Sequence, residues 1–287
     1  MFLGHINDLK DGEWKVYPQL KGWALHNTAG KYSLSSNICP HQGSYLNDTS
    51  GKNVRFCPYH GWSFKVTGEP MGSGTTACKN TEHLQIKEVF IWNGFIFSEE
   101  HDLPSTAIST KHLILAETRV DTVNADWTSV LDLFLDVDHI PVVHPRVYSQ
   151  LTPTELVWDI KTNTSTQLVP TDKEFSNDYT QSFLPEDKDL EYGAGWFTVY
   201  PYSMLEWQPG AWFITVCRPK GDTTEVTVYK YRDTRYSNEN WELNQKIWET
   251  AWAQDCEQSE RMIPRIETKY PEKAKVHFYE WIKQRGL

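Results

Sequence analysis

Two short stretches, Cys39-Pro-His41-Gln-Gly and Cys57-Pro-Tyr-His60-Gly-Trp, indicate that the N-terminal part of the chain folds around a metal centre. Each stretch has a cysteine and a histidine separated by one or two residues, which places two metal-binding side chains on one short loop. Together the loops offer two thiolates and two imidazoles. Such a set can hold a structural, tetrahedral Zn²⁺. It can equally hold a [2Fe–2S] cluster, with cysteines on one iron and histidines on the other.

The sequence around these loops, from Trp14 to about Phe97, is a succession of short β-type runs. Turn-forming stretches such as Asn27-Thr-Ala-Gly-Lys and Thr67-Gly-Glu-Pro separate the runs. The cysteines and histidines should therefore lie on turns between strands. We expect an all-β module here, with Cys78 as an ordinary thiol outside both loops.

Residues 98–111 are polar, contain a proline and lack a hydrophobic period, which is typical of a connection between domains. We therefore expect one domain at residues 1–105 and a second at residues 106–287. His101 and His112 are expected to face solvent.

A second metal-binding pattern lies in Asp132-Leu-Phe-Leu-Asp136-Val-Asp-His139-Ile-Pro-Val-Val-His144. A helix turns by about 100° per residue, so Asp132, Asp136 and His139 would share one face. Pro141 lacks an N–H and clashes with an earlier carbonyl, so we expect the helix to kink or stop just before it. The break would let His144 turn back beside His139. Two imidazoles plus a distant carboxylate is the ligand set of non-haem Fe(II) oxygenases, and an amphipathic helix with incidental histidines is the alternative.

The C-terminal half contains further β-type runs between residues 150 and 235, including one that begins at Glu155, and then two helical patterns, Asn238–Ile263 and Pro271–Lys283. Several runs alternate with period two, which predicts an antiparallel sheet with one face buried. The fold class is therefore α+β. The expected buried residues of the last helix are Val276, Phe278, Trp281 and Ile282. The candidates for the wall of a pocket over the metal are Phe197, Tyr200, Met204, Trp207 and Phe213.

Composition excludes several classes of function. The net charge is −10, from 28 Lys and Arg against 38 Asp and Glu, so the surface should repel a nucleic-acid backbone. No stretch approaches 18 apolar residues, and the N-terminus lacks a signal-like pattern, so we expect a cytoplasmic protein without a membrane span. Five cysteines, an odd number in such a chain, argue against a disulfide framework and favour metal binding.

The two cysteine–histidine loops, with Gly68 shortly after the second, closely resemble the cluster loops of Rieske domains. By that resemblance Cys39 and Cys57 bind one iron of a [2Fe–2S] cluster, and His41 and His60 bind the other. Neutral imidazoles in place of two thiolates raise the reduction potential, to about −150 to +300 mV in this class of cluster. The resemblance therefore implies a cluster that accepts electrons readily and passes them on singly.

The resemblance continues past the cluster domain. Trp127 and the segment from Asp132 to His144-Pro are similar to the mononuclear-iron segment of Rieske non-haem iron oxygenases, the alpha-subunit family of ring-hydroxylating dioxygenases and demethylating monooxygenases. It implies a helix-grip catalytic domain in which His139 and His144 bind iron. It also implies a homotrimer, in which Asp136 links a cluster histidine of one subunit to an iron-ligating histidine of its neighbour.

The spacing of Asp132 and Asp136 is nearest to the vanillate and dicamba demethylase branch of that family. Two positions depart from the family pattern. Leu133 stands where many members have Asn, which puts a hydrogen bond there in doubt. Asp138 stands where an aromatic or small residue often precedes the first histidine, and we expect it to face solvent.

Asp255, in Trp252-Ala-Gln-Asp255, resembles the third iron ligand, which the family supplies from a late helix. Glu249 and Glu257 are the alternatives for this role. A fourth possibility is that Asp255 is an ordinary solvent-exposed acid of a helix.

These features together predict the oxygenase component of a Rieske non-haem iron oxygenase. It would activate O₂ to hydroxylate or demethylate an aromatic or methylated small molecule. The chain has no Gly-rich dinucleotide fingerprint, so the electrons of NAD(P)H should arrive through a separate reductase or ferredoxin. Two alternatives are a Rieske electron-transfer protein with a non-catalytic binding domain and a zinc-stabilised binding module.

Overall fold

The computed structural model of the chain describes residues 1–17, 20, 22–46, 50–74, 80–136, 138–145, 147, 156–170, 192–264 and 272–287. The expectations for Cys78 and for the start of a strand at Glu155 fall outside these residues. The chain divides into two compact units, one of Phe2–Glu100 and one of Met1 with His101–Leu287.

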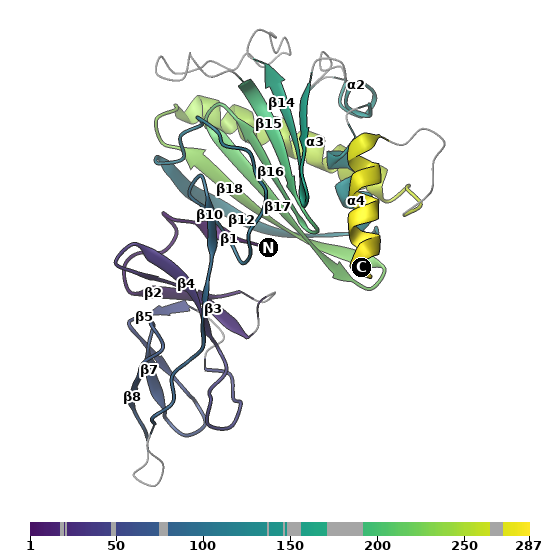
Figure 1. Cartoon of the computed structure of the whole chain (residues 1–287). Coiled ribbons are helices and arrows are strands. Elements are labelled where there is room, and N and C mark those ends of the chain that lie inside the picture. The colour runs from purple at the N-terminus through teal and green to yellow at the C-terminus, as the bar shows by residue number, and fades with distance from the viewer. Residues whose placement is uncertain are drawn as a thin grey trace. The chain divides into compact units, whose positions relative to one another are not determined.

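The N-terminal unit consists of antiparallel β-sheets (Figure 1). Its central sheet has the order β5-β2-β3-β4-β9, with strands Ser50–Lys52, Glu13–Val16, Trp23–Thr28, Lys31–Ser36 and Ile86–Glu88. A second sheet, β1-β11-β10, comprises Phe2–His5, Phe95–Phe97 and Phe90–Trp92. A third sheet, β6-β7-β8, comprises Val54–Phe56, Ser63–Lys65 and Pro70–Gly72. The two cysteine–histidine loops follow β4 and β6, as the turn pattern predicted.

The C-terminal unit is built on a seven-stranded antiparallel sheet. Its order is β12-β18-β17-β16-β15-β14-β13, with strands Leu113–Val123, Thr223–Asp233, Ala211–Lys220, Ser203–Gln208, Tyr192–Val199, Thr164–Pro170 and Val157–Ile160. Tight turns at Pro209-Gly210 and Gly221-Asp222 join the strands β16, β17 and β18 in sequence. The central strands are almost wholly buried, because the sheet forms one side of the core.

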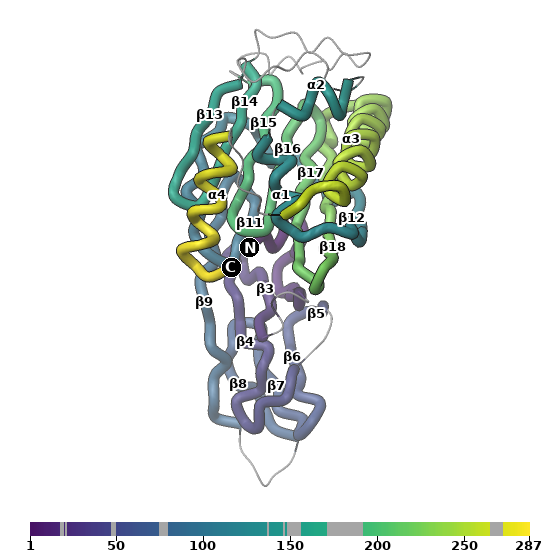
Figure 2. The backbone as a smooth tube through the Cα atoms, turned by 90° about the vertical axis from the view of Figure 1, so that its right-hand side faces the viewer, coloured from purple at the N-terminus to yellow at the C-terminus, as the bar shows by residue number. Residues whose placement is uncertain are grey.

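The helices among the described residues of this unit lie on one face of the sheet (Figure 2). They are α1 (Trp127–Phe134), α2 (Ile140–Val143), α3 (Asn238–Ser259) and α4 (Lys273–Gln284). Side chains of α1, α3 and α4 share a core cluster with strand residues such as Phe213 and Val228. The predicted α+β fold is therefore confirmed, with an all-β unit followed by an antiparallel sheet gripped by helices.

Two burial predictions in this unit were wrong. His101 is only 3% exposed, although its polar surroundings suggested solvent, and its Nε2 lies 3.5 Å from the amino group of Met1. Val276 is exposed, because α4 turns Ala274, Phe278 and Ile282 toward the core. Trp281 is partly buried against that core, as expected.

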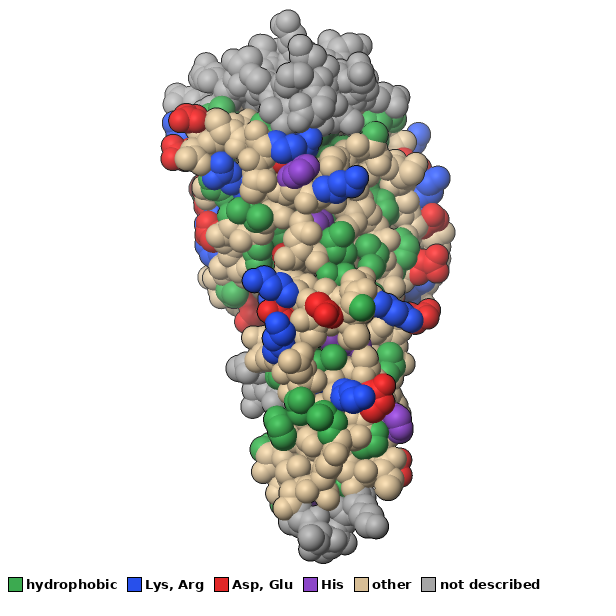
Figure 3. Space-filling model, turned by 90° about the vertical axis from the view of Figure 1, so that its left-hand side faces the viewer, with side chains coloured by type: hydrophobic (Ala, Val, Ile, Leu, Met, Phe, Trp, Pro, Cys, Tyr) green, Lys and Arg blue, Asp and Glu red, His purple; other side chains and the backbone are tan. Residues whose placement is uncertain are grey.

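The surface shown in Figure 3 carries basic and acidic side chains interspersed with one another. Within the described residues, none of the helices has the length and hydropathy needed to cross a bilayer.

Phe278 offers a direct test of how α4 is held. Its side chain is fully buried against Trp127 and Tyr200. We expect Phe278→Ala to reduce the free energy of unfolding of this unit by about 3–5 kcal/mol, because it leaves a cavity. The matched control is Val276→Ala on the exposed side of the same helix, which should change it by less than about 0.5 kcal/mol. Urea unfolding followed by near-UV circular dichroism measures both, and equal effects would contradict this packing.

Candidate metal centres and pocket

The two cysteine–histidine loops have the same backbone construction. The Gly43 N–H donates to the Cys39 carbonyl, and the Gly61 N–H donates to the Cys57 carbonyl, each at 3.0 Å. Both glycines have positive φ, 73° and 71°, where a side chain would be strained. At Gly61 an added Cβ would also lie 2.8 Å from backbone. Glycine after each ligand pair is therefore required by the turn.

The four candidate ligands of these loops come together. Cys39 and Cys57 are buried and close enough for a hydrogen bond between their thiols. The rings of His41 and His60 lie 4.8 Å apart between centroids. Nδ1 of His60 is buried and has no hydrogen-bond partner among the described residues, as expected of a nitrogen that faces a metal. The residues present fit a Cys₂His₂ cluster.

The electrostatics of the two thiols also suit metal binding, which requires thiolates. Burial raises the pKa of the Cys39 thiol. Burial acts in the same direction on Cys57, but backbone N–H groups of His60 and Tyr59 outweigh it and lower the pKa of that thiol. The loop backbone thus stabilises negative charge on sulfur.

A substitution at Cys57 tests this cluster. We expect Cys57→Ser to abolish the visible absorption and the acid-labile sulfide of an iron–sulfur cluster, since a serine hydroxyl is a poor ligand to this softer metal site. Cys217→Ala, at a buried cysteine of β17, is the matched control and should keep both signals. Full retention of the absorption in Cys57→Ser would exclude Cys57 as a ligand.

The predicted course of the chain around His139 was wrong in one respect. Helix α1 ends at Phe134, so Asp136 and His139 do not continue it, and the break comes before Pro141 rather than at it. Pro141 lies in the first turn of the short helix α2, where a missing N–H costs nothing. The N-terminal end of α1 agrees with prediction, because Asp126 caps it by accepting the N–H of Thr128.

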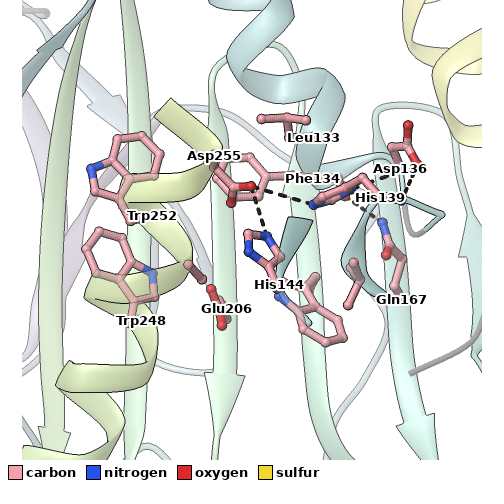
Figure 4. Close-up of a pocket in the computed structure, with 13 residues that line it drawn as sticks. Leu133, Phe134, Asp136, His139, His144, Gln167, Glu206, Trp248, Trp252 and Asp255 are labelled. Atoms are coloured by element: carbon pink, nitrogen blue, oxygen red, sulfur yellow. Dashed lines mark hydrogen bonds and ion pairs between the residues drawn. The ribbon is translucent and has the colours of Figure 1, made fainter. Parts of the chain in front are cut away.

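The short helix α2 brings the two histidines together. His139 is its N-cap residue and His144 its C-cap residue, and their rings lie 5.2 Å apart between centroids. Asp255 reaches them from α3, with its Oδ1 3.0 Å from Nε2 of His144 and 3.6 Å from Nε2 of His139 (Figure 4). One ligand atom from each of the three residues lies within 4.8 Å of the others. The set suits a non-haem iron with open coordination positions.

The other nitrogen of each imidazole faces a supporting group. Nδ1 of His144 is 2.8 Å from Oε1 of Gln254, a hydrogen bond of the kind that fixes the orientation of a metal-binding imidazole. Nδ1 of His139 lies 3.9 Å from Oδ1 of Asp136, which is beyond hydrogen-bond distance, while the backbone N–H of His139 donates to the same oxygen at 3.3 Å. Nothing in the sequence had identified Gln254, although its position directly before Asp255 places it at the same turn of α3.

The charges at this site favour a cation. Burial would lower the pKa of His139, but Asp136 and Asp255 outweigh it and raise the pKa to about 9. Burial would likewise raise the pKa of Asp255, but the two imidazoles outweigh it and lower that pKa. A metal ion would take the place of the proton between these groups.

The alternative ligands Glu249 and Glu257 lie elsewhere. Glu249 binds Arg119 and Lys230, and Glu257 forms an exposed pair with Arg261. Of the three acids weighed from the sequence, Asp255 is therefore the one that meets the histidines.

Asp136, the predicted bridging residue, lies beside the metal-binding set and is held by α4. Its Oδ2 accepts a hydrogen bond from Nζ of Lys275 at 2.9 Å, and its Oδ1 accepts the N–H of Asp138 at 2.9 Å. Burial acts to raise its pKa, but His139 and Lys275 outweigh it and lower the pKa. Asp136 is thus a fixed anion next to His139. Asp138 is exposed, as predicted.

Asp132 lies on the buried side of α1, where Tyr279 donates a hydrogen bond to it at 2.5 Å. Burial, partly opposed by Tyr279, raises its pKa from 3.8 to about 6. Since the pKa is higher in the folded state, the stability that this group contributes is present below about pH 4 and is lost as the pH rises through about 6.

The direction of this pH dependence can be tested by replacing the carboxyl group of Asp132. As the pH rises from 5 to 7, we expect the unmodified protein to lose about 1 kcal/mol of its free energy of unfolding relative to Asp132→Asn, which has no carboxylate at this position. Asp138→Asn, at an exposed position in the next segment, should show little pH-dependent difference. Chemical unfolding at the two pH values measures this, and the same difference at both would contradict the raised pKa.

A pocket opens over the metal-binding set, with about 490 Å³ of empty space including its mouth. None of the five wall residues proposed from the sequence is among the described residues that line it, because they belong to the core or to the opposite face of the sheet. Apart from the candidate ligands and Asp136, the lining residues are Leu133, Phe134, Ile140, Gln167, Trp196, Glu206, Trp248, Ala251 and Trp252.

One wall of the pocket belongs to a column of nearly parallel aromatic rings. Phe134, Trp252 and Trp248 line the pocket, and Phe213 continues the column into the core, with successive centroid separations of 6.4, 5.6 and 5.3 Å. Nε1 of Trp252 also donates to Asp121 at 2.9 Å, which fixes the indole in the column. Mutual packing of this kind makes the wall rigid.

Comparison with known proteins agrees with this arrangement. Residues 1–85 match the family model of the Rieske [2Fe–2S] domain. Over 266 residues the chain is 23% identical to putrescine 2-hydroxylase of Ralstonia nicotianae, covering 85% of this chain and 73% of the relative. It is 28% identical over 239 residues to the carnitine monooxygenase oxygenase subunit of Acinetobacter pittii, covering 73% and 61%. The chain thus spans about two thirds of the length of these relatives.

Among solved structures, the quaternary ammonium Rieske monooxygenase CntA in complex with L-carnitine superposes with a TM-score of 0.70. The sequence identity is 17%, and the match covers 99% of this chain and 88% of that one, so the fold is shared. Together these similarities support the predicted Rieske oxygenase alpha subunit. They support a [2Fe–2S] cluster through the domain match and a mononuclear iron through the His139–His144–Asp255 set.

Proposed function

We propose that the chain is the oxygenase component of a Rieske non-haem iron oxygenase. The observation that carries the proposal is the convergence of His139, His144 and Asp255 below a pocket, in a chain that also contains a Rieske domain. A Rieske electron-transfer protein with a non-catalytic second domain would have no use for a second metal-binding set.

In this proposal Cys39, His41, Cys57 and His60 hold the [2Fe–2S] cluster, which passes on single electrons from a separate reductase or ferredoxin. His139, His144 and Asp255 hold a mononuclear iron, which supplies the activation of O₂ when bound. Asp136 links the two centres, between neighbouring subunits of a homotrimer. An anion suits this place because it accepts a hydrogen bond from an imidazole on each side.

The net reaction inserts one oxygen atom of O₂ into a C–H bond of a small molecule. The C–H bond breaks, a C–OH group forms, and the second oxygen atom leaves as water after taking up two electrons and two protons. Where the carbon is an O- or N-methyl, the hydroxylated product loses formaldehyde. The spacing of Asp132 and Asp136 supports this demethylating branch.

The chain's own residues prepare the pocket for this chemistry. Gln254 orients the imidazole of His144 through a hydrogen bond to its Nδ1, and the Nε2 atoms of both histidines face Asp255. Phe134, Trp248 and Trp252 give the space above the metal-binding set an apolar wall. An apolar wall disfavours water near the reacting groups and so limits side reactions with solvent.

The test combines iron analysis with an activity screen. We expect Asp255→Asn to lose the mononuclear iron and to keep the two irons of the cluster, with Glu257→Gln on the same helix as the control that keeps all three. The unmodified protein, with a surrogate reductase, is then screened against amines, methylated compounds and aromatic compounds for substrate-dependent O₂ uptake. Equal iron content in Asp255→Asn and Glu257→Gln would contradict the proposed iron site.

A further inference from the structure

Arg55 stands out in the N-terminal unit, because its positive charge is wholly removed from solvent. It lies in the middle of β6, and its exposed fraction is 0%. A guanidinium group keeps its charge at neutral pH even when it is buried. Such a charge is costly unless an anion or a set of hydrogen-bond acceptors faces it. The surroundings of Arg55 therefore indicate what the charge is for.

The groups that hold the guanidinium of Arg55 are neutral. Its Nη1 donates to Oγ of Ser35 at 2.7 Å and to the carbonyl of Ser36 at 3.0 Å, and its Nη2 donates to Oδ1 of Asn37. The guanidinium also lies over the ring of Trp14, 5.4 Å from the ring centroid. Among the described residues, no carboxylate forms an ion pair with Arg55. These contacts fix the position of the charge without neutralising it.

The position of Arg55 relates it to both candidate cluster cysteines. It precedes Cys57 by two residues, and the N–H of Cys57 still pairs with the returning chain, because it donates to the carbonyl of Trp62. Residues two apart along extended backbone project from the same face. Asn37, which accepts from Nη2 of Arg55, likewise precedes Cys39 by two residues. Arg55 therefore joins the two strands at the point where each one leads into its cluster loop.

The side chain of Arg55 leaves β6 on the side where the thiols lie. Its cross-strand partner is Phe64 of β7, and cross-strand partners project from the same face of a sheet. Phe64 packs with Cys39 and Cys57 in one buried group. The charge is therefore held in the protein interior, close to the place where the four candidate ligands come together.

A Cys₂His₂ cluster in this place would become the anion that Arg55 lacks. Two ferric ions, two sulfides and two thiolates leave such a cluster without net charge when it is oxidised, and one added electron makes it negative. Attraction between this negative charge and the guanidinium is strong in the protein interior, where water does not screen it. A fixed buried cation thus favours the reduced state, which raises the reduction potential.

We propose that Arg55 raises the reduction potential of the [2Fe–2S] cluster, by stabilising the reduced cluster with a buried positive charge. The inference rests on the cluster that the proposed function requires. It deepens that function by naming a residue that controls how readily the cluster takes up an electron. The charge favours transfer of an electron from the reductase to the cluster over its return.

The midpoint potential is measured on the cluster-loaded full chain, in an anaerobic spectroelectrochemical titration followed by the visible circular dichroism of the cluster. Arg55→Met keeps much of the length of the side chain and removes its charge. We expect this variant to lower the equilibrium constant for electron uptake by about tenfold, which corresponds to about 59 mV for a one-electron couple. The matched control, Lys65→Met, removes an exposed cation from the neighbouring strand β7. It should change the constant by less than about twofold, because water screens that charge.

Two further variants separate the charge of Arg55 from its packing. Arg55→Lys keeps the positive charge but loses the planar group, and we expect it to lower the constant by less than about threefold. Asn37→Asp keeps the contact with Nη2 and neutralises the guanidinium, and we expect it to lower the constant by about fivefold or more. Asn37→Asp decides the question if Arg55→Met does not assemble a cluster.

The inference is overturned if Arg55→Met, with its cluster assembled, has the same potential as Lys65→Met. It is also overturned if Arg55→Lys lowers the potential as far as Arg55→Met does, since the effect would then come from packing. Where Arg55→Met lacks a cluster, an unchanged potential in Asn37→Asp has the same meaning.

This titration involves neither O₂ nor a substrate, so its failure can be told apart from that of the proposed function. The expected shifts in a protein that shows no substrate-dependent O₂ uptake would support the role of Arg55 and reject the oxygenase. Unshifted potentials in a protein that shows such uptake would retain the oxygenase and reject the role of Arg55. An unmodified protein that assembles no iron–sulfur cluster would reject both.

Discussion

The arrangement of the C-terminal unit depends on one buried contact, the meeting of the Asp255 carboxylate with the imidazoles of His139 and His144. A carboxylate removed from water is costly unless positive charge or hydrogen-bond donors face it. The two imidazoles come from the ends of a one-turn helix, and the carboxylate comes from the middle of α3. The contact therefore forms only when α2 and α3 are packed correctly over the sheet, which makes the packing of these helices a condition for metal binding.

Further contacts connect the His139–His144–Asp255 set to the surrounding helices and to the sheet. Gln254 holds the imidazole of His144, Asp136 accepts the backbone N–H of His139, and Asp136 is in turn held by Lys275 of α4. The aromatic column fixes α3 against β17 through Trp248 and Phe213. Helices that are far apart in the sequence are thus joined to the metal-binding set by a short series of direct contacts, and each of them contributes to its geometry.

The sequence was most informative where the chemistry is local. The cysteines and histidines of the two loops and the His139–His144 pair each lie within a few residues, so spacing indicated them as candidate metal ligands, and the resemblance then indicated which metal centres they would form. Helix α1 begins where its cap residue, Asp126, predicted. Asp255 was reached only through resemblance, because a ligand on a distant helix leaves no local pattern. The prediction that a helix ends at Pro141 was wrong, because proline is also common in the first turn of a helix, and Pro141 occupies that position in α2. The pocket wall was mispredicted because the face of each strand depends on register, which the period of a strand does not determine.

Gln167, Trp196 and Glu206 are successive cross-strand partners on β14, β15 and β16, and all three line the pocket. The candidate iron ligands stand elsewhere, at the two ends of α2 and on α3. The lining of the pocket can therefore vary one residue at a time on the sheet, while the candidate ligand set on the helices stays the same.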